Sequence, residues 1–93
     1  MMMLEFQYSH GFKKELKQAV FQGRDVMKIF PPLVMLLTGQ PLPPHYLDHP
    51  LKGKWAGHRE FHLEPDWLVI YRIENGKTLV LVSTGTHSEL LKK

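Results

Sequence analysis

The strongest signal for the fold is HREFHLEPDWLVIYRIENGKTLVLVST, residues 58–84. It contains three segments with the composition of strands, separated by two turn signals, Glu64-Pro65-Asp66 and Asn75-Gly76. Asn-Gly is a strong signal for a two-residue hairpin, because both central residues of that turn need positive φ. We therefore expect an antiparallel meander of three strands over residues 58–64, 67–74 and 78–84.

The N-terminal half predicts one further strand and two helices. Residues 4–8 alternate apolar and polar side chains, and Ser9 follows as a helix N-cap. An amphipathic helix to about residue 22 is predicted by apolar residues at spacings of three and four: Phe12, Leu16, Ala19 and Val20. Residues 25–37 repeat this spacing, but Pro31-Pro32 within them predicts either a fresh helix start at Pro31 or a kink.

These elements predict an α+β fold in the order strand, helix, helix and then three strands. The two N-terminal helices should pack on one face of a four-stranded antiparallel sheet. A chain of 93 residues with a hydrophobic fraction of 43% can form one core but not two folding units. We therefore expect a single domain over residues 1–93.

Composition limits the compartment and the classes of partner that we expect for the protein. The chain has no cysteine, which excludes a disulfide framework and cysteine-ligated zinc. No segment approaches the roughly 20 apolar residues of a membrane span, and the start lacks the pattern of a secretion signal. We expect a soluble, cytoplasmic protein with no membrane partner. The net charge of +3 and the pI of about 9.3 favour polyanionic partners such as RNA.

Candidate catalytic residues accumulate in the second half of the chain: His49, His58, His62, Asp66 and His87. Because side chains alternate along a strand, one face of the first meander strand should be polar and exposed, with His58, Glu60, His62 and Glu64 on it. Histidine, with an unperturbed pKa of about 6.5, gives or takes a proton near neutrality. Cleavage of RNA needs both actions, because a base takes the 2′-OH proton and an acid protonates the departing 5′-oxygen.

The same reaction needs cations beside the phosphoryl oxygens. Lys52, Lys54 and Arg72 are the candidates for this role, and we add His58 to the predicted substrate-binding residues. A zinc or iron site is the competing interpretation, which we do not favour, because His58 and His62 lie roughly 13 Å apart along a strand and no HExxH pattern is present.

Each of these residues also has an ordinary structural role. His49 before Pro50 could hold a backbone carbonyl in a turn, and Asp66 could accept from backbone N–H groups of its own turn. Trp67 is more often a core residue than a platform for a base. His87 could cap the closing segment, residues 88–92. The residue types alone leave structural and catalytic roles open.

Three motifs at their spacings resemble the YafQ branch of the RelE/ParE toxin superfamily. They are DHPL at residues 48–51, HxEPDW at residues 62–67 and TGTH at residues 84–87. The Leu42-Pro43 connector matches as well, and the resemblance covers most of the chain. The combination of the three motifs is specific, although each alone would be weak.

The resemblance implies a type II toxin. Such a protein is a ribosome-dependent endoribonuclease that cuts mRNA in the ribosomal A site without a metal or other cofactor. A cognate antitoxin, similar to DinJ or RelB, holds it inactive by covering the basic surface with an acidic, partly disordered segment. By the same resemblance His87 is the general acid, while His62, Asp66 and His49 share the base, orienting and phosphate-binding roles. Trp67 shapes the pocket or stacks on a base.

Two other functions remain open. Superfamily members of the ParE type share the fold but bind DNA gyrase, and such a module has no need for several titratable groups near one strand. A degenerate toxin would bind its antitoxin and cleave poorly. The chain departs in three places from the pattern expected of relatives. Ser83 precedes TGTH where relatives carry an arginine, and Leu91 stands where they carry an aromatic residue. Pro31-Pro32 lies within a helix that is usually continuous in relatives.

Overall fold

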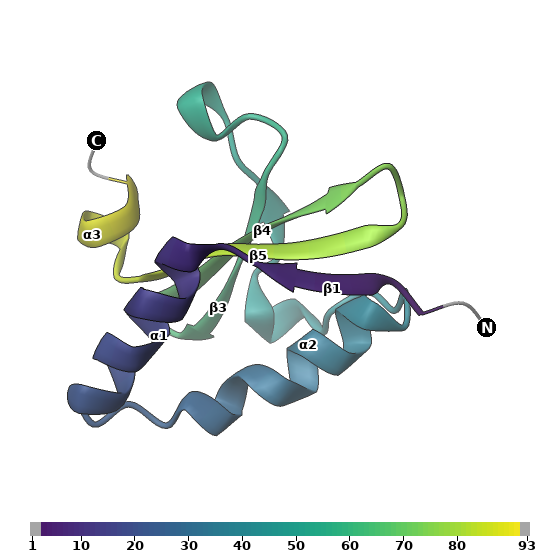
Figure 1. The fold of residues 1–93 in the computed structure, drawn as a ribbon. Helices are drawn as coiled ribbons and strands as arrows, with labels where there is room; N and C mark the ends of the chain where they lie inside the picture. Colours follow the sequence, from purple (N-terminus) through teal and green to yellow (C-terminus); the bar gives the residue numbers. More distant parts are fainter. Residues whose placement is uncertain (1–2, 92–93) are drawn as a thin grey trace.

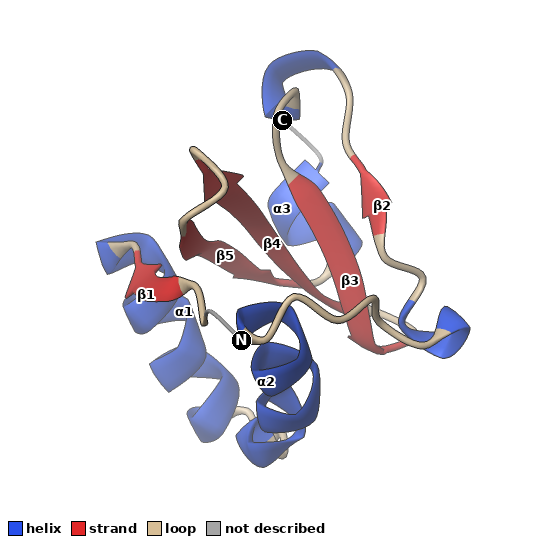
Figure 2. Ribbon diagram, turned by 90° about the vertical axis from the view of Figure 1, so that its right-hand side faces the viewer, coloured by secondary structure: helices blue, strands red, loops and turns tan. Residues whose placement is uncertain are grey.

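The computed structural model describes residues 3–91 and shows an α+β fold with a mixed five-stranded sheet and three α-helices. Helices α1 and α2 lie together on one side of the sheet, and α3 lies on the other side (Figures 1 and 2). The elements are β1 (Glu5–Tyr8), α1 (His10–Phe21), α2 (Phe30–Leu37), β2 (His49–Pro50), β3 (Arg59–Glu64), β4 (Trp67–Glu74), β5 (Thr78–Gly85) and α3 (His87–Leu91). Short 3₁₀ turns lie between them at Val26–Ile29, Pro44–Tyr46 and Gly53–Trp55.

The sheet corrects the predicted four-stranded antiparallel arrangement. Its strand order is β1-β5-β4-β3-β2, and β1 runs parallel to β5, with Phe6 opposite Leu79. A fifth strand, β2, pairs antiparallel with β3. The prediction was wrong here because alternation shows which face of a strand is buried, but not which strand lies beside it or in which direction. The two residues of β2 are also too few to show a period.

The predicted meander is confirmed as β3, β4 and β5, which pair antiparallel. Asn75 and Gly76 have φ of 53° and 67°, the positive values that a tight hairpin turn requires. The pairing of β3 with β4 shifts register between His62 and Glu64, at the end of the strand that leads into the turn. Because of this shift, the direction of the Asp66 side chain cannot be read from the alternation of side chains along β3.

Local signals explain where the helices begin. The Ser9 hydroxyl accepts from the N–H of Phe12 at 2.9 Å and so caps α1, as predicted. Pro31 and Pro32 fall in the first turn of α2, where no backbone N–H is needed, so the chain makes a fresh helix start and not a kink.

The structure has a third helix, α3, in addition to the two that were predicted. A reciprocal capping box begins this helix: the Thr86 hydroxyl accepts from the N–H of Glu89, and the Glu89 carboxylate accepts from the N–H of Thr86. The sequence signal was present as Thr-x-x-Glu. The last residue of the closing segment predicted over 88–92 lies outside the described residues.

Apolar side chains pack on both faces of the sheet. Between the sheet and α1 and α2 lies the larger core, which includes Phe12, Ile29, Phe61, Val69 and Tyr71. A smaller cluster on the opposite face joins Leu68 and Ile70 to Leu90 of α3. None of the helices in residues 3–91 is long and apolar enough to cross a membrane.

Candidate functional site

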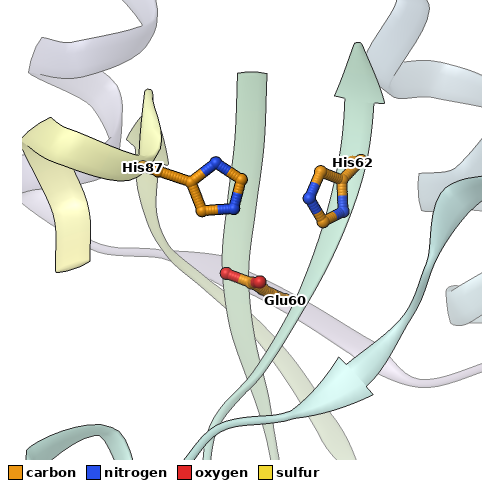
Figure 3. Close-up of side chains that lie close together, drawn as sticks. All are labelled: Glu60, His62 and His87. Atoms are coloured by element: carbon orange, nitrogen blue, oxygen red, sulfur yellow. The ribbon is translucent and has the colours of Figure 1, made fainter. Parts of the chain in front are cut away.

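Titratable side chains gather on the face of the sheet opposite α1 and α2. They come from β2, β3, the β3–β4 turn and α3, and they are His49, Glu60, His62, Asp66 and His87; we call them the histidine cluster. The ring centroids of His62 and His87 lie 5.3 Å apart, and those of His49 and His62 lie 6.3 Å apart. Figure 3 shows the rings of His62 and His87 facing each other, with the Glu60 carboxylate between and below them.

Asp66 fixes His87 through two hydrogen bonds to one oxygen. Its Oδ1 accepts from the backbone N–H of His87 at 3.0 Å and lies 3.1 Å from the ring Nδ1. These bonds from the backbone and the ring of His87 hold the pKa of Asp66 below its ordinary value. A carboxylate only accepts, so His87 Nδ1 carries a hydrogen and the other ring nitrogen, Nε2, stays available for chemistry.

His49 and Glu60 form a second hydrogen-bonded pair. His49 Nδ1 lies 2.6 Å from the carbonyl oxygen of Leu47, which can only accept, so Nδ1 carries a hydrogen. His49 Nε2 lies 2.9 Å from Glu60 Oε2. The pair therefore holds one proton between these two atoms, either on the imidazole or on the carboxyl group.

Glu60 is the functional candidate that sequence reasoning missed. Only 2% of its surface is exposed, whereas the whole polar face of β3 was predicted to be exposed. That prediction was wrong for Glu60 because β2 pairs beside it, with His49 directly opposite. The available signal was its position on the same strand face as His62.

His62 is half-buried and lies between the two hydrogen-bonded pairs. Its Nδ1 is buried and has no hydrogen-bond partner within residues 3–91. No neighbour in this part of the chain fixes its tautomer through that atom.

Trp67 does not present a ring to the histidine cluster. Its side chain is fully buried on the helix side of the sheet, where its Nε1 donates to Thr84 Oγ1 at 3.0 Å. The guanidinium of Arg24 lies 5.3 Å from the ring centroid. The predicted stacking on a base is therefore inconsistent with the structure, because no ring face is free. Trp67 can support the site only from behind, because its buried side chain anchors the chain directly after Asp66.

The predicted substrate-binding cations lie outside the histidine cluster. The Arg72 guanidinium pairs with Glu74 at 2.7 Å and lies four residues along β4 from Leu68, which is opposite His62. Lys52 and Lys54 are exposed in the loop after β2, whose Trp55 packs near Leu90 of α3. This loop therefore flanks the site.

His58 is not brought into the cluster either. Its ring packs edge-to-face on Trp55, with 5.3 Å between the centroids, and its Nδ1 lies 3.4 Å from the carbonyl oxygen of Ala56.

Asp48 of the DHPL motif anchors the chain before His49. Its Oδ1 accepts from the Tyr71 hydroxyl at 2.7 Å and from Arg59 Nε at 3.1 Å. Burial and the neighbouring Asp48 raise the pKa of Tyr71, so the phenol keeps its hydrogen and remains a donor. This anchor explains why the motif contains an aspartate next to the histidine.

The departures at Ser83 and Leu91 do not touch the histidine cluster. The Ser83 hydroxyl donates to Glu15 Oε1 of α1 at 2.7 Å. Leu91 packs against the smaller apolar cluster around Leu68. Both residues therefore have structural partners of their own.

Comparison with known proteins gives a consistent picture. A family model described as "Bacterial toxin of type II toxin-antitoxin system, YafQ" matches residues 4–92. The mRNA interferase toxin YafQ of Escherichia coli K12 is 38% identical over 91 residues, 97% of this chain and 98% of the relative. The solved E. coli DinJ-YafQ toxin-antitoxin complex matches with a TM-score of 0.86 at 38% identity, covering 95% of this chain and 97% of that one. A metal-bound toxin from Helicobacter pylori matches with a TM-score of 0.87 at 46% identity, covering 95% and 99%.

Proposed function

This chain belongs to the YafQ family of bacterial type II toxins, and from this premise we propose that it is an mRNA interferase, an endoribonuclease that works by histidine acid-base catalysis. The observation that carries the proposal is that the ring of His62 lies beside the ring of His87. Asp66 binds Nδ1 of His87 and so leaves Nε2 available. A single domain thus holds a base and an acid within reach of one phosphodiester.

His87 is the proposed general acid. Asp66 accepts from Nδ1, so a proton on Nε2 creates an imidazolium that the carboxylate stabilises. His87 then gives the Nε2 proton to the departing 5′-oxygen. The exposed position of the ring lets the leaving group approach it.

His62 is the proposed general base. Its ring lies next to that of His87, and because its Nδ1 is buried, Nε2 is the nitrogen proposed to act, whereas His49 Nε2 is already engaged by Glu60. His62 takes the 2′-OH proton as the 2′-oxygen attacks phosphorus, and the bond from phosphorus to the 5′-oxygen breaks. The products are a 2′,3′-cyclic phosphate and a 5′-OH end. Both proton transfers use side chains of the protein, so the proposed mechanism is independent of metal.

Substrate positioning is shared between the protein and the ribosome in this proposal. A shallow cavity of about 360 Å³ opens beside His62, lined in part by Leu47 and Pro65. Lys52 and Lys54 flank the site and can reach the RNA backbone. Such an open site does not enclose an RNA strand, so we propose that the A site of cytoplasmic ribosomes presents the mRNA.

We propose that an antitoxin similar to DinJ holds the protein inactive, as the E. coli relative forms a DinJ-YafQ complex. An apolar groove of about 290 Å³ lies between β1, α1 and α2, with Phe6, Tyr8 and Phe30 partly exposed along it. The exposed Lys13 of α1 lines it as well. This combination suits an amphipathic segment with acidic flanks.

The test is induced expression of the wild type, His87→Gln and the control His10→Gln, with mapping of mRNA 5′ ends during translation. His10 is exposed at the start of α1. We expect new in-frame ends for the wild type and the control, and their loss in His87→Gln, since a general acid contributes about 10²–10⁴-fold in rate. Equal toxicity of all three proteins without new ends would contradict the nuclease and favour a ParE-like protein target.

A further inference from the structure

The turn that carries Asp66 is a two-residue hairpin loop, Pro65-Asp66, between the ends of β3 and β4. Glu64 and Trp67 lie opposite each other in the sheet and close this loop, and we call them the closing pair. The Asp66 side chain is 67% exposed, so packing around it does little to fix its direction. The position of its carboxylate relative to His87 therefore depends on how firmly the closing pair is held.

Arg24 contacts both members of the closing pair. Its Nη1 lies 3.6 Å from Oε1 of Glu64, and the two side chains form an ion pair. Its guanidinium lies 5.3 Å from the centroid of the Trp67 ring, which is within the range of a cation–π interaction. Because the Arg24 side chain is only 25% exposed, water screens these contacts less than it would at an open surface. One guanidinium thus bridges the two strand ends that flank Asp66.

The end of α1 fixes the backbone from which the Arg24 side chain extends. Gly23 has a φ of 81°, the left-handed conformation that glycine adopts without strain just after a helix. The N–H of Gly23 donates to the carbonyl of Val20, and the N–H of Arg24 donates to the carbonyl of Ala19. These two bonds form a Schellman motif, so Arg24 leaves the helix in one defined direction. The bridge is therefore built on an ordered helix end.

The charge of Arg24 acts on Asp66 as well. Hydrogen bonds from the backbone and the ring of His87 are the main reason why the pKa of Asp66 lies below its ordinary value, and the nearby charge of Arg24 adds to this effect. Arg24 therefore favours the ionised carboxylate, which is the form that accepts from Nδ1 of His87. The contacts and the charge of Arg24 both help to keep Asp66 bonded to His87.

We propose that Arg24 is a positioning residue for cleavage: it holds the closing pair of the β3–β4 hairpin and so keeps the Asp66 carboxylate bonded to His87. This role rests on the proposed function, in which His87 is the general acid. Arg24 itself transfers no proton and binds no part of the RNA in this proposal. Its whole effect on the reaction passes through Asp66.

The test is a double-mutant cycle, measured as single-turnover mRNA cleavage on ribosomes. Arg24→Gln should lower the maximal rate by about threefold or more, a coupling expected between residues in contact. The ribosome concentration that gives half of the maximal rate should stay the same, because Arg24 holds the hairpin and not the RNA. In the Asp66→Asn background, Arg24→Gln should cause almost no further slowing.

Two results of the cycle would overturn the proposal. Equal slowing by Arg24→Gln in both backgrounds would show a role that does not pass through Asp66. An unchanged maximal rate with a higher half-saturating ribosome concentration would show a contact with the substrate instead.

Two further variants separate the bridge from its parts. Arg24→Lys keeps a cation beside the closing pair and also serves if Arg24→Gln folds poorly, as judged by circular dichroism. Its rate should lie between those of the wild type and Arg24→Gln, because an ammonium keeps the charge but not the planar guanidinium; a rate below that of Arg24→Gln would contradict the bridge.

Lys28→Gln is the matched control. Lys28 Nζ binds Oε2 of Glu64 at 2.9 Å, so its loss removes one ion pair of Glu64 and leaves the contacts of Arg24 in place. This variant should cleave like the wild type. Slowing equal to that of Arg24→Gln would assign the effect to the charge around Glu64 and overturn the role of the bridge.

Nitrogen-15 shifts of the His87 ring test the positioning without any cleavage. Nδ1 of the wild-type ring carries the hydrogen that Asp66 accepts. Arg24→Gln should move both ring shifts toward a mixture of tautomers, the direction also expected for Asp66→Asn, and His10 should stay unchanged. Wild-type His87 shifts in Arg24→Gln would overturn the positioning role. Moved shifts in a protein that cleaves no mRNA even as wild type would contradict the proposed nuclease, while showing that Arg24 still orders His87.

Discussion

The two faces of the sheet differ although the same strands build both. On the face covered by α1 and α2, Phe61 is fully buried among apolar side chains. On the opposite face its two chain neighbours, Glu60 and His62, converge with His87. One residue of strand separates the core from the histidine cluster, because successive side chains point to opposite faces. The cluster is thus supported by a close-packed core directly behind it.

The faces are also held together by different interactions. The helix face depends on apolar burial, whereas the cluster face depends on hydrogen bonds that join separate elements. Asp66 connects the β3–β4 turn to α3, and the His49–Glu60 pair connects β2 to β3. Substitutions on the helix face should therefore reduce stability and activity together, and substitutions in the cluster should reduce activity more than stability.

The largest expected effect on stability is on the helix face. Phe61→Ala should lower the free energy of unfolding by about 3–5 kcal/mol, because it leaves a cavity beside the rings of Tyr46 and Tyr71. Phe21→Ala is the matched control, since Phe21 is 90% exposed and should change stability by less than about 0.5 kcal/mol. Urea unfolding measures both. A similar cost for the two variants would contradict the contrast between core and surface.

Asp66→Asn tests the orienting hydrogen bond on the cluster face. It should slow mRNA cleavage at least about tenfold, part of the 10²–10⁴-fold that a positioned acid contributes. The amide can donate to His87 Nδ1, which places the hydrogen on the wrong nitrogen. Single-turnover cleavage on ribosomes measures the rate. Asp25→Asn, at the start of the 3₁₀ turn Val26–Ile29, is the control and should cleave normally; equal rates for the two variants would refute the orienting role.

Thr86→Ala should weaken α3 alone. It removes the acceptor for the N–H of Glu89, at a cost of about 1 kcal/mol. Thr38→Ala is the control, because the Thr38 hydroxyl donates to carbonyls at the end of α2 and accepts only from the Gln40 side chain, so its loss leaves no backbone N–H without an acceptor and should cost less. Hydrogen exchange measures local opening. Faster exchange restricted to α3 is expected, and faster exchange throughout the sheet would contradict a local role.

The smallest effect is the dependence of stability on pH through Asp66. Its pKa is lower in the folded chain than the ordinary value of 3.8, because His87 donates to the ionised form. The ionised group therefore stabilises the fold above pH 3.8, and this contribution is lost as the pH falls through the folded pKa. Unfolding in urea should show the wild type more stable than Asp66→Asn at pH 7, with the difference shrinking in acid. A difference that stays constant to pH 2 would contradict the pairing.

Local signals predicted much of the fold. The Asn75-Gly76 hairpin and the Ser9 cap each depend on residues a few positions apart, and the structure confirms both. Of the two alternatives for Pro31-Pro32, the structure shows the fresh helix start, one residue earlier than predicted, at Phe30. The capping box of α3 was equally local but was not recognised. The partner of β1 was not predictable in this way, because β5 lies at the opposite end of the chain and no local period encodes it.

The candidate site was predicted in part. The motifs pointed to His49, His62, Asp66 and His87, and the structure brings these four together. It does not bring Arg72 or His58 into the cluster, and it turns Trp67 to the helix face, which it shares with Val69 and Tyr71. Residue type indicates what a side chain can do, whereas its partners depend on which elements pack beside it.

Residue order alone was sufficient for the family, the meander and the chemical character of the site, because these depend on motifs and on short periodic patterns. The burial of Glu60, the tautomer of His87 and the convergence of β2, β3 and α3 emerged only in the folded chain. These features depend on contacts between residues far apart in sequence, and such contacts are set by packing and strand pairing rather than by any local spacing.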